Sequence, residues 1–114
     1  LFKIENQNLG SPVTIKYLGL NISLDYALCM EEILFLNNYM KNVTQVLEIG
    51  AGCGRTCHSI LSIHEEIKNY IICDLPEMLN FSSAYLKKVL PKIQYDKIWF
   101  IENDKIQHIK KVDL

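Results

Sequence analysis

The residues whose types suggest chemistry lie in one short stretch, residues 46–55. Apolar residues typical of a buried strand are followed there by three glycines at every second position, which indicates a strand that ends in a tight turn into a helix. Glycine lets a ligand lie against the backbone and takes positive φ at little cost. The N–H groups that open the next helix point towards whatever occupies the turn. The sequence therefore predicts a cofactor-binding turn made of Gly50, Ala51, Gly52, Cys53 and Gly54.

The spacing of the glycines and the charge beside them discriminate between cofactors. The dinucleotide fingerprint is G-x-G-x-x-G, whereas here Arg55 stands at the third glycine position and Gly54 lies one residue early. Glu48, two residues before Gly50, would place a carboxylate at the strand end, close to the negative pyrophosphate of NAD. A ligand with an ammonium group suits this position better. We therefore interpret Glu48 as a partner for a cationic group of the cofactor.

A second acidic residue ends the next predicted strand. Asp74 follows Gly54 by twenty residues, about where a ribose-binding carboxylate lies in a βαβ unit. Asp74 is predicted to accept hydrogen bonds from ribose hydroxyls; the alternative is that it caps the helix opened by Pro76. Asp74 alone does not distinguish NAD from other nucleoside cofactors.

Together these motifs resemble those of the class I S-adenosylmethionine-dependent methyltransferases, whose motif I reads acid-x-G-x-G-x-G at a strand-to-helix turn. Residues 74–77, which read D-L-P-E, resemble the same element in small-molecule O-methyltransferases. Residues 8–12 resemble a Leu-Gly-Asn-Pro element, with Ser11 in place of the usual Asn. The likeness covers about residues 8–102 and is closest to the bacterial sugar O-methyltransferases.

The resemblance implies a fold, a cofactor and a set of binding residues. The fold would be α/β, a Rossmann-like doubly wound parallel sheet, with only an N-terminal helix and a β-α-β-α-β half present. The cofactor would be S-adenosylmethionine. Asn103 and Asp104 follow the third predicted strand, where the superfamily often contacts adenine, although a simple turn explains them equally well. The predicted cofactor-binding residues are Glu48, Gly50, Ala51, Gly52, Cys53, Gly54, Arg55, Asp74, Leu75, Asn103 and Asp104.

Arg55 opens the helix that follows the glycine turn. A cation at a helix N-terminus opposes the helix dipole by ~0.3–1 kcal/mol, so an offsetting partner is expected. One hypothesis is that the guanidinium meets a carboxylate of the cofactor or of the acceptor; the alternative is a solvated surface arginine.

The resemblance also implies that the acceptor pocket and the catalytic base come after a fourth strand. No catalytic residue is therefore assigned, and the chain alone is expected to be inactive.

Hydrophobic periodicity divides the chain into two parts. Residues 1–44 are predicted to form an N-terminal loop and helical extension, with Ser23 as the N-cap of an amphipathic helix over about residues 24–40. Residues 45–114 are predicted to form a truncated S-adenosylmethionine-binding half-domain. Its expected strands lie at 46–49, 69–74 and 97–101, and its helices at 55–63 and from 76 to the stop at Pro91.

Two further features of the chain bear on its completeness and its surface. The first residue is Leu1, and the sequence of residues 112–114 is typical of the start of a fourth strand, so a fragment of a larger domain is expected.

Trp99 and Phe100, in the third strand, are expected in the core. A second apolar flank on the first helix predicts contact with something beyond the sheet, and a homo-oligomer is one expectation.

Composition and charge exclude several classes of partner. The chain of 114 residues supports one domain at most, and 49% hydrophobic with 22% charged residues is ordinary for a globular fold. A net charge of -1 provides no basic field for nucleic acid or an anionic membrane surface. No apolar run approaches the ~18 residues of a transmembrane helix. A cytoplasmic location and a small-molecule sugar or glycan precursor as partner are expected.

The cysteines and histidines do not predict a metal site. Cys53-x-x-x-Cys57-His58 fits no common zinc signature and supplies too few ligands. All four cysteines are expected to remain reduced. His58, His64 and His108 are expected at the surface.

The function favoured by these motifs is transfer of a methyl group from S-adenosylmethionine to a hydroxyl of a sugar or glycan precursor. Two alternatives stay open. An NAD-dependent Rossmann oxidoreductase is disfavoured by Arg55 and Glu48. The non-enzymatic alternative is a truncated, non-catalytic binding or interaction module.

Overall fold

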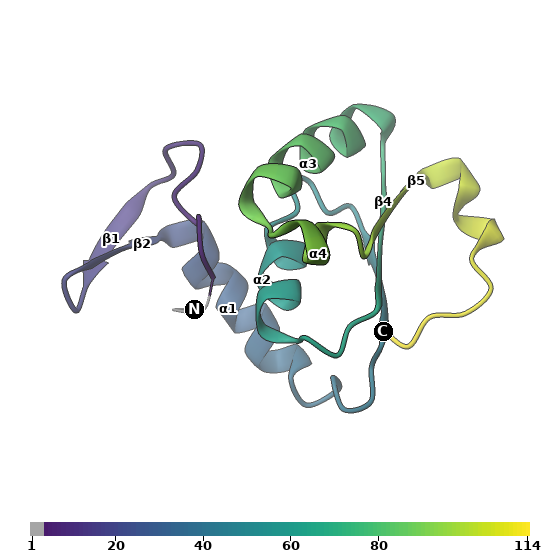
Figure 1. Cartoon of the computed structure of the whole chain (residues 1–114), viewed down its shortest axis with the longest axis horizontal. Coiled ribbons are helices and arrows are strands. Elements are labelled where there is room, and N and C mark those ends of the chain that lie inside the picture. The colour runs from purple at the N-terminus through teal and green to yellow at the C-terminus, as the bar shows by residue number, and fades with distance from the viewer. Residues whose placement is uncertain (1–3) are drawn as a thin grey trace.

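The structure, a computed structural model, describes residues 4–114; residues 1–3 of the predicted N-terminal extension lie outside the described residues. A hairpin and a helix precede an alternating β/α segment (Figure 1). The elements are β1 (Thr14–Tyr17), β2 (Leu20–Ser23), α1 (Leu24–Leu36), β3 (Gln45–Ile49), α2 (Arg55–Ile63), β4 (Asn69–Asp74), α3 (Pro76–Val89), α4 (Lys92–Tyr95), β5 (Ile98–Glu102) and the 3-10 helix η1 (Asn103–His108).

The centre of the fold is a three-stranded parallel sheet in the order β3-β4-β5. Val46 pairs with Tyr70, and Tyr70 pairs with Ile98, so the strands lie in register from one edge to the other. Connections between parallel strands are almost always right-handed crossovers, in which the connecting helix packs back onto the sheet. Figure 1 shows α2 and α3 on one side of the sheet, with residues 103–111 on the other. The predicted α/β class and the order β-α-β-α-β are confirmed.

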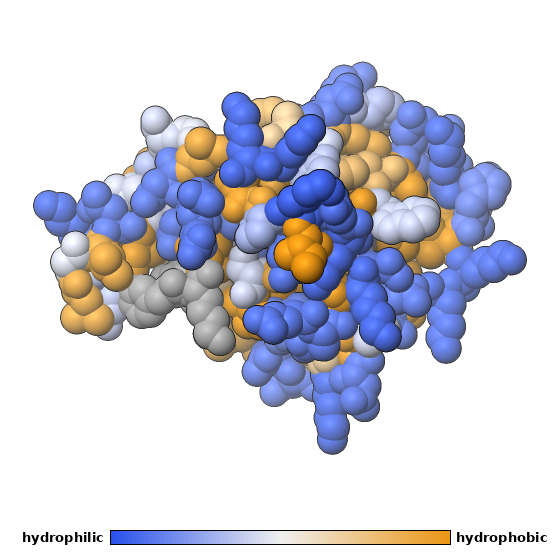
Figure 2. Space-filling view, in the orientation of Figure 1, coloured by the Kyte–Doolittle hydropathy of each residue, from blue (hydrophilic) through white to orange (hydrophobic). Residues whose placement is uncertain are grey.

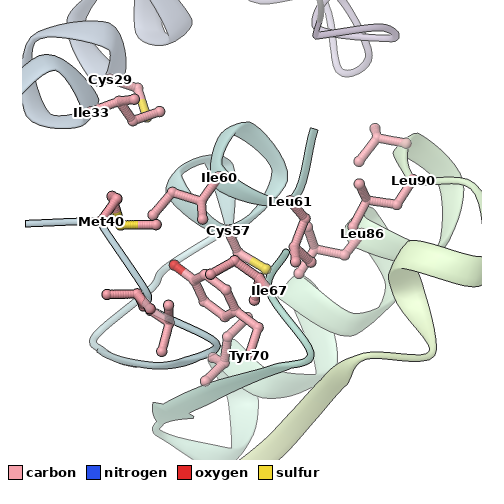
Figure 3. Close-up of a cluster of buried hydrophobic side chains, with 14 of the residues drawn as sticks. Cys29, Ile33, Met40, Cys57, Ile60, Leu61, Ile67, Tyr70, Leu86 and Leu90 are labelled. Atoms are coloured by element: carbon pink, nitrogen blue, oxygen red, sulfur yellow. The ribbon is translucent and has the colours of Figure 1, made fainter. Parts of the chain in front are cut away.

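The main core lies between the sheet and its helices. Figure 3 shows side chains of α2 and α3 gathered with Tyr70 of β4 and with Ile67, which precedes it. Parallel strands that are covered by helices are usually rich in branched apolar residues, and the sequence of β4 follows this pattern. The buried side chains of this cluster include Cys57, Ile60, Leu61, Ile67, Tyr70, Ile72, Leu86 and Val89.

The other face of the sheet is largely open. Trp99 is 62% exposed and Ile49 is 65% exposed, while Phe100 packs at the edge of the core on the helix side. The prediction that Trp99 lies in the core is therefore wrong. Its side chain points to the face opposite α2 and α3, which among the described residues only η1 and the segment after it border, and strand periodicity alone does not tell which face is covered.

The last residues pair with the free edge of β3. The N–H of Leu114 donates to the carbonyl of Gln45 at 3.3 Å, and the N–H of Leu47 donates to the carbonyl of Leu114 at 2.8 Å. The Asp113 carboxylate accepts from the N–H groups of Thr44 and Gln45 at 2.9 Å each. This is the bonding of a parallel neighbour, as predicted for a strand beginning at residues 112–114.

The N-terminal part departs most from prediction. β1 and β2 form an antiparallel hairpin, where the sequence analysis predicted a loop. α1 ends at Leu36 rather than near residue 40, because the chain turns at 37–39. Ser23 is the N-cap residue of α1, as predicted, but its buried hydroxyl makes no hydrogen bond within the described residues. Between residues 4 and 114, no helix combines the length and hydrophobicity needed to cross a membrane.

The surface mixes polar and apolar side chains. In the space-filling view of Figure 2, hydrophilic residues dominate the visible face, with hydrophobic residues scattered between them. Exposed apolar side chains of β1, the following turn and β2 include Ile15, Tyr17, Leu18 and Leu20. The hairpin therefore contributes little to the buried core around the sheet.

Candidate functional site

The glycine turn lies at the carboxyl end of β3 and leads directly into α2. Gly50, Gly52 and Gly54 have φ of 75°, 58° and 88°. All three lie in the left-handed region that side chains other than glycine adopt at a cost. The turn is tied to the sheet by the N–H of Gly50, which donates to the carbonyl of Cys73 at 2.9 Å. The predicted strand-to-helix turn is confirmed.

The three glycines face different surroundings. A Cβ added at Gly50 or Gly52 would meet no other atom within 4 Å, so the backbone there is open on one side. A Cβ at Gly54 would lie 2.8 Å from Cδ1 of Leu86 in α3. The first two glycines therefore leave room for a ligand, whereas Gly54 lets α3 approach the start of α2. Ala51 and Cys53 lie between them and are half-buried.

Asp74, at the carboxyl end of β4, holds the turn from the side. Its Oδ2 accepts from the N–H of Gly52 at 3.0 Å, and its Oδ1 accepts from the N–H of Leu75 at 2.8 Å. The side chain is buried, with 7% of the residue exposed. Neighbouring parallel strands end at the same edge of a sheet, which brings this acid beside the glycines although 22 residues separate it from Gly52.

Glu48 lies inside the layer formed by the sheet and the helices. Its carboxylate accepts from the hydroxyl of Tyr70 at 2.8 Å. Burial raises the pKa of this carboxyl, and the nearby Glu32 and Asp74 raise it further, while the bond from Tyr70 and the Thr56 hydroxyl lower it. No described cation pairs with Glu48. A buried carboxylate without a counter-ion would be stabilised by a cationic ligand group.

The partner that offsets Arg55 is an acid of this chain. The guanidinium lies 3.0 Å from Asp25 in the first turn of α1, and both side chains are partly exposed. The first turns of α1 and α2 are joined in this way. Of the two interpretations of Arg55, a solvated arginine and a ligand-binding one, neither predicted this internal ion pair, because residues 25 and 55 meet only through the tertiary fold.

The remaining predicted binding residues lie around the same edge of the sheet. Leu75 is 55% exposed directly after β4. Asn103 follows β5 and accepts a hydrogen bond from the Cys73 thiol at 3.3 Å, and Asp104 is exposed beside it. Both open η1, so the turn predicted for them is a single 3-10 helix. The sheet thus brings Asp74, Leu75 and Asn103 to one end of the molecule with the glycine turn.

In the sheet, β4, which ends in Asp74, lies directly beside β3, which leads into the glycine turn. Solved structures with a similar fold are known. The chain has a fold similar to part of known methyltransferase domains. The methyltransferase domain of bacterial CtHen1-C superposes with a TM-score of 0.57, at 20% sequence identity, over 70% of this chain and 40% of that chain. That of bacterial CtHen1-CN gives a TM-score of 0.55, also at 20% identity, over 70% of this chain and 41% of that chain.

The likeness is confined to part of each known structure. The chain spans about two fifths of the length of these methyltransferase domains. A third structure, PigF with SAH, has a TM-score of 0.49 at 25% identity over 60% of this chain and 19% of that chain, too weak a likeness to carry an argument. The sequence matches no protein-family model and none of the curated proteins with which it was compared.

One buried polar cluster beside the glycine turn was missed by sequence reasoning. The Tyr26 hydroxyl lies 2.6 Å from Nδ1 of His58 and 2.7 Å from the hydroxyl of Tyr85. The cluster joins α1, α2 and α3. Burial lowers the pKa of His58 to about 4 and raises that of Tyr26. Among residues 4–114, no group of three or more His, Cys, Asp or Glu side chains is placed to hold a metal ion.

The surface positions predicted for two histidines are wrong. His58 is 1% exposed, because α1 and α3 cover the side of α2 that lies away from its apolar stripe. His64 is 9% exposed and its Nδ1 lies 3.0 Å from Glu66. His108 is exposed as predicted. The signal that could have found His58 is Tyr26, an aromatic residue with a polar tip on the inner face of the preceding helix.

Proposed function

We propose that this chain binds S-adenosylmethionine at the glycine turn and forms the cofactor-binding part of a methyltransferase. The acceptor we propose is a hydroxyl of a sugar or glycan precursor. The acceptor class is supported by the resemblance of residues 74–77 to the D-L-P-E element of small-molecule O-methyltransferases. The cofactor is supported by the fold and by the residues described above.

The observation that carries the proposal is the open backbone at Gly50 and Gly52 beside the Asp74 carboxylate. A nucleoside needs a surface without side chains and an acceptor for its ribose hydroxyls. Each oxygen of Asp74 accepts one backbone hydrogen bond and has a lone pair left for a further donor. The residues present therefore fit the group that the fold implies.

Other residues of the chain would contact different parts of the cofactor. Glu48 carries an uncompensated negative charge below the turn, which suits the amino group of the cofactor. Leu75 offers an exposed apolar side chain next to Asp74, and Asn103 and Asp104 offer polar groups for the base. The bound cofactor would supply an electrophilic methyl group on a sulfonium.

Methyl transfer to a hydroxyl also needs correct orientation and removal of a proton. Orientation within a site is worth up to ~7–11 kcal/mol in favourable intramolecular cases, and the glycine turn with Asp74 would contribute it on the cofactor side. We assign no proton acceptor among the described residues. We further propose, as the default for such a chain, a cytoplasmic location.

The experiment that tests this proposal compares two ligands on the full chain. Thermal unfolding and titration calorimetry are measured with S-adenosylhomocysteine and with NAD. A ligand at ~100 times its dissociation constant stabilises the folded state by ~2.7 kcal/mol. We expect stabilisation by S-adenosylhomocysteine and none by NAD.

A matched variant makes the comparison specific to the site. Asp74→Ala should abolish the shift caused by S-adenosylhomocysteine while Asp104→Ala, at the exposed rim, should reduce it only slightly. Stabilisation by NAD alone refutes the proposal. No response to either ligand would favour a non-catalytic interaction module.

A further inference from the structure

The hydroxyl of Thr56, in the first turn of α2, lies close to two carboxylates. Its Oγ1 donates to Oε2 of Glu32 in α1 at 3.3 Å. Burial raises the pKa of the Glu48 carboxyl, the neighbouring Glu32 raises it further, and the Thr56 hydroxyl lowers it, so both groups lie near Glu48. Glu48 is half-buried beneath the glycine turn, whereas Glu32 is exposed. The two acids therefore form a pair with one member inside the fold and one at its surface.

This acid pair, Glu32 and Glu48, has no cation beside it in the described part of the chain. Neither carboxylate takes part in an ion pair there, and α1 contains no lysine or arginine. Arg55 precedes Thr56 directly, but its guanidinium is engaged by Asp25 at 3.0 Å. Like charges close together disfavour ionisation of both groups, and a positive charge nearby reverses this effect. The acid pair therefore favours a ligand that brings one positive group.

The set of oxygen atoms suits an ammonium group better than a metal ion. Ca²⁺ takes roughly six to eight oxygen ligands, and Mg²⁺ requires a nearly octahedral set. Two carboxylates and one hydroxyl do not make such a set, and no group of metal-binding side chains is found among residues 4–114. An ammonium group carries three N–H donors and no acceptor. These donors match Glu32, Glu48 and Oγ1 of Thr56 one to one.

The acid pair lies between described elements, beside the open part of the glycine turn. α1 packs against α2, and Figure 1 shows the two helices next to each other. Glu48 is two residues before Gly50, where an added Cβ would meet no atom within 4 Å. The side chain of Glu48 points to the helix layer, since it accepts from the Tyr70 hydroxyl of the buried core. The open face of the sheet has no part in this arrangement.

We propose that Glu32 and Glu48 together hold the amino group of S-adenosylmethionine, with Oγ1 of Thr56 as the third acceptor. The hydroxyl can accept from the ammonium group while it still donates to Glu32. Glu32 of α1 is then a specificity-determining residue, because it selects ligands that carry a free amino group. The inference rests on the proposed function and deepens it, since it names the side chains that recognise one group of that cofactor.

The test compares S-adenosylhomocysteine with an analogue in which hydrogen replaces the amino group. Titration calorimetry on the full chain gives the dissociation constant of each ligand. We expect the parent chain to bind the amino-bearing ligand at least about tenfold more tightly. Glu32→Gln should weaken binding of S-adenosylhomocysteine by about tenfold and change binding of the analogue by less than about twofold. A merely structural role of Glu32 would weaken both ligands alike.

Matched variants control for charge and for the hydroxyl. Glu31→Gln makes the same change at the neighbouring exposed position of α1 and should bind both ligands like the parent chain. Thr56→Ser keeps the hydroxyl and should also bind like the parent. Thr56→Val removes the hydroxyl and should weaken only S-adenosylhomocysteine. Circular dichroism checks that every variant is folded.

Proton release gives a second measurement at the same site. Because burial raises the pKa of Glu48, part of the unliganded chain carries this proton in mildly acidic buffer, and an ammonium group beside the carboxyl would displace it. Calorimetry in two buffers of different ionisation enthalpy counts the protons released. S-adenosylhomocysteine should release more than the analogue does, and Glu48→Gln should abolish the difference.

The outcomes separate this inference from the proposed function. If the parent chain binds neither ligand, the proposed function fails and the inference falls with it. If the parent chain binds S-adenosylhomocysteine but Glu32→Gln weakens both ligands equally, or neither, only the role given to Glu32 is wrong. Equal affinity of the parent chain for the two ligands would show that the acid pair does not hold the amino group.

Discussion

The Oδ2 atom of Asp74 accepts a hydrogen bond from the N–H of Gly52 at 3.0 Å and so ties the end of β4 to the turn after β3. The same carboxylate accepts from the N–H of Leu75 at the start of α3. One side chain thus fixes the positions of two strand ends and one helix start. It does so without using all of its lone pairs, which leaves it able to accept further donors.

Replacing Asp74 should affect both stability and ligand binding. Asp74→Ala leaves the N–H of Gly52 without its partner, at a cost of about 1–3 kcal/mol in the free energy of unfolding. Urea unfolding of the unliganded chain measures this loss. Asp74→Asn is the matched variant, because its amide oxygen can keep one of the two bonds. Equal stability of all three proteins would show that the bond to Gly52 does not hold the turn.

The glycines of the turn should not tolerate alanine equally. At Gly54 the new Cβ would meet Leu86 at 2.8 Å with φ at 88°, so strain and overpacking together should cost about 2–5 kcal/mol. At Gly52 only the left-handed conformation is penalised, by about 1–2 kcal/mol, since no atom lies within 4 Å. Chemical denaturation compares the two variants. The order reverses for S-adenosylhomocysteine affinity, where Gly52→Ala should be the more damaging.

The buried His58 should make stability depend on pH. Its pKa falls from 6.5 to about 4 on burial, so the unfolded chain binds more protons between these values. Its contribution is full above pH 6.5 and is lost as the pH falls towards 4, by about 3 kcal/mol in total. Unfolding of His58→Asn at several pH values should show a shallower dependence across this window.

Tyr26→Phe separates burial from hydrogen bonding at the same site. It removes the 2.6 Å contact with Nδ1 but leaves His58 covered, so the pH dependence should persist while overall stability drops. Titration of His58 followed by NMR gives its pKa directly. A value near 6.5 would mean that the ring is hydrated and that the burial described above is wrong.

The ion pair between Arg55 and Asp25 should contribute little stability. The two side chains are 39% and 45% exposed, and such pairs contribute about 0–1 kcal/mol. Asp25→Ala should cost more than Arg55→Ala, because it leaves a cation facing the N-terminus of α2 and removes an acid from the first turn of α1. A double-mutant cycle by thermal unfolding measures the coupling.

Arg55→Ala also tests the ligand hypothesis for this side chain. With the guanidinium engaged by Asp25, the dissociation constant of S-adenosylhomocysteine should change by less than about threefold, which is under 1 kcal/mol. Calorimetric titration decides this. A larger loss would show that the guanidinium leaves Asp25 to meet a carboxylate of the cofactor.

The strands and helices around the glycine turn were predictable because local signals agree there. α2 occupies Arg55–Ile63 and β4 occupies Asn69–Asp74, as their periodicity indicates. The turn between α2 and β4, together with Pro76 after β4, leaves few other positions at which these elements could begin or end. The placement of Asp74 beside Gly52 followed from the general geometry of parallel strands.

The remaining features depend on contacts between distant segments. His58 is buried because α1 and α3 both lie over it, and no pattern within α2 contains that information. Trp99 is exposed for the opposite reason, since only η1 and the segment after it border its face of the sheet among the described residues. The hairpin was missed because Leu18 and Gly19 form a turn with positive φ at both residues while the flanking strands lack a clear alternation.

The pairing of Leu114 with Gln45 and Leu47 has a consequence for local opening of the sheet. The amide proton of Leu47 is shielded by the carbonyl of Leu114, 67 positions further along the chain. This bond lies on the outer side of β3, and contacts at the edge of a sheet open more readily than those of central strands. Hydrogen exchange at Leu47 should therefore be much faster than at Tyr70, whose amide lies inside the sheet, and its rate would report how often the edge of β3 becomes free to pair with another strand.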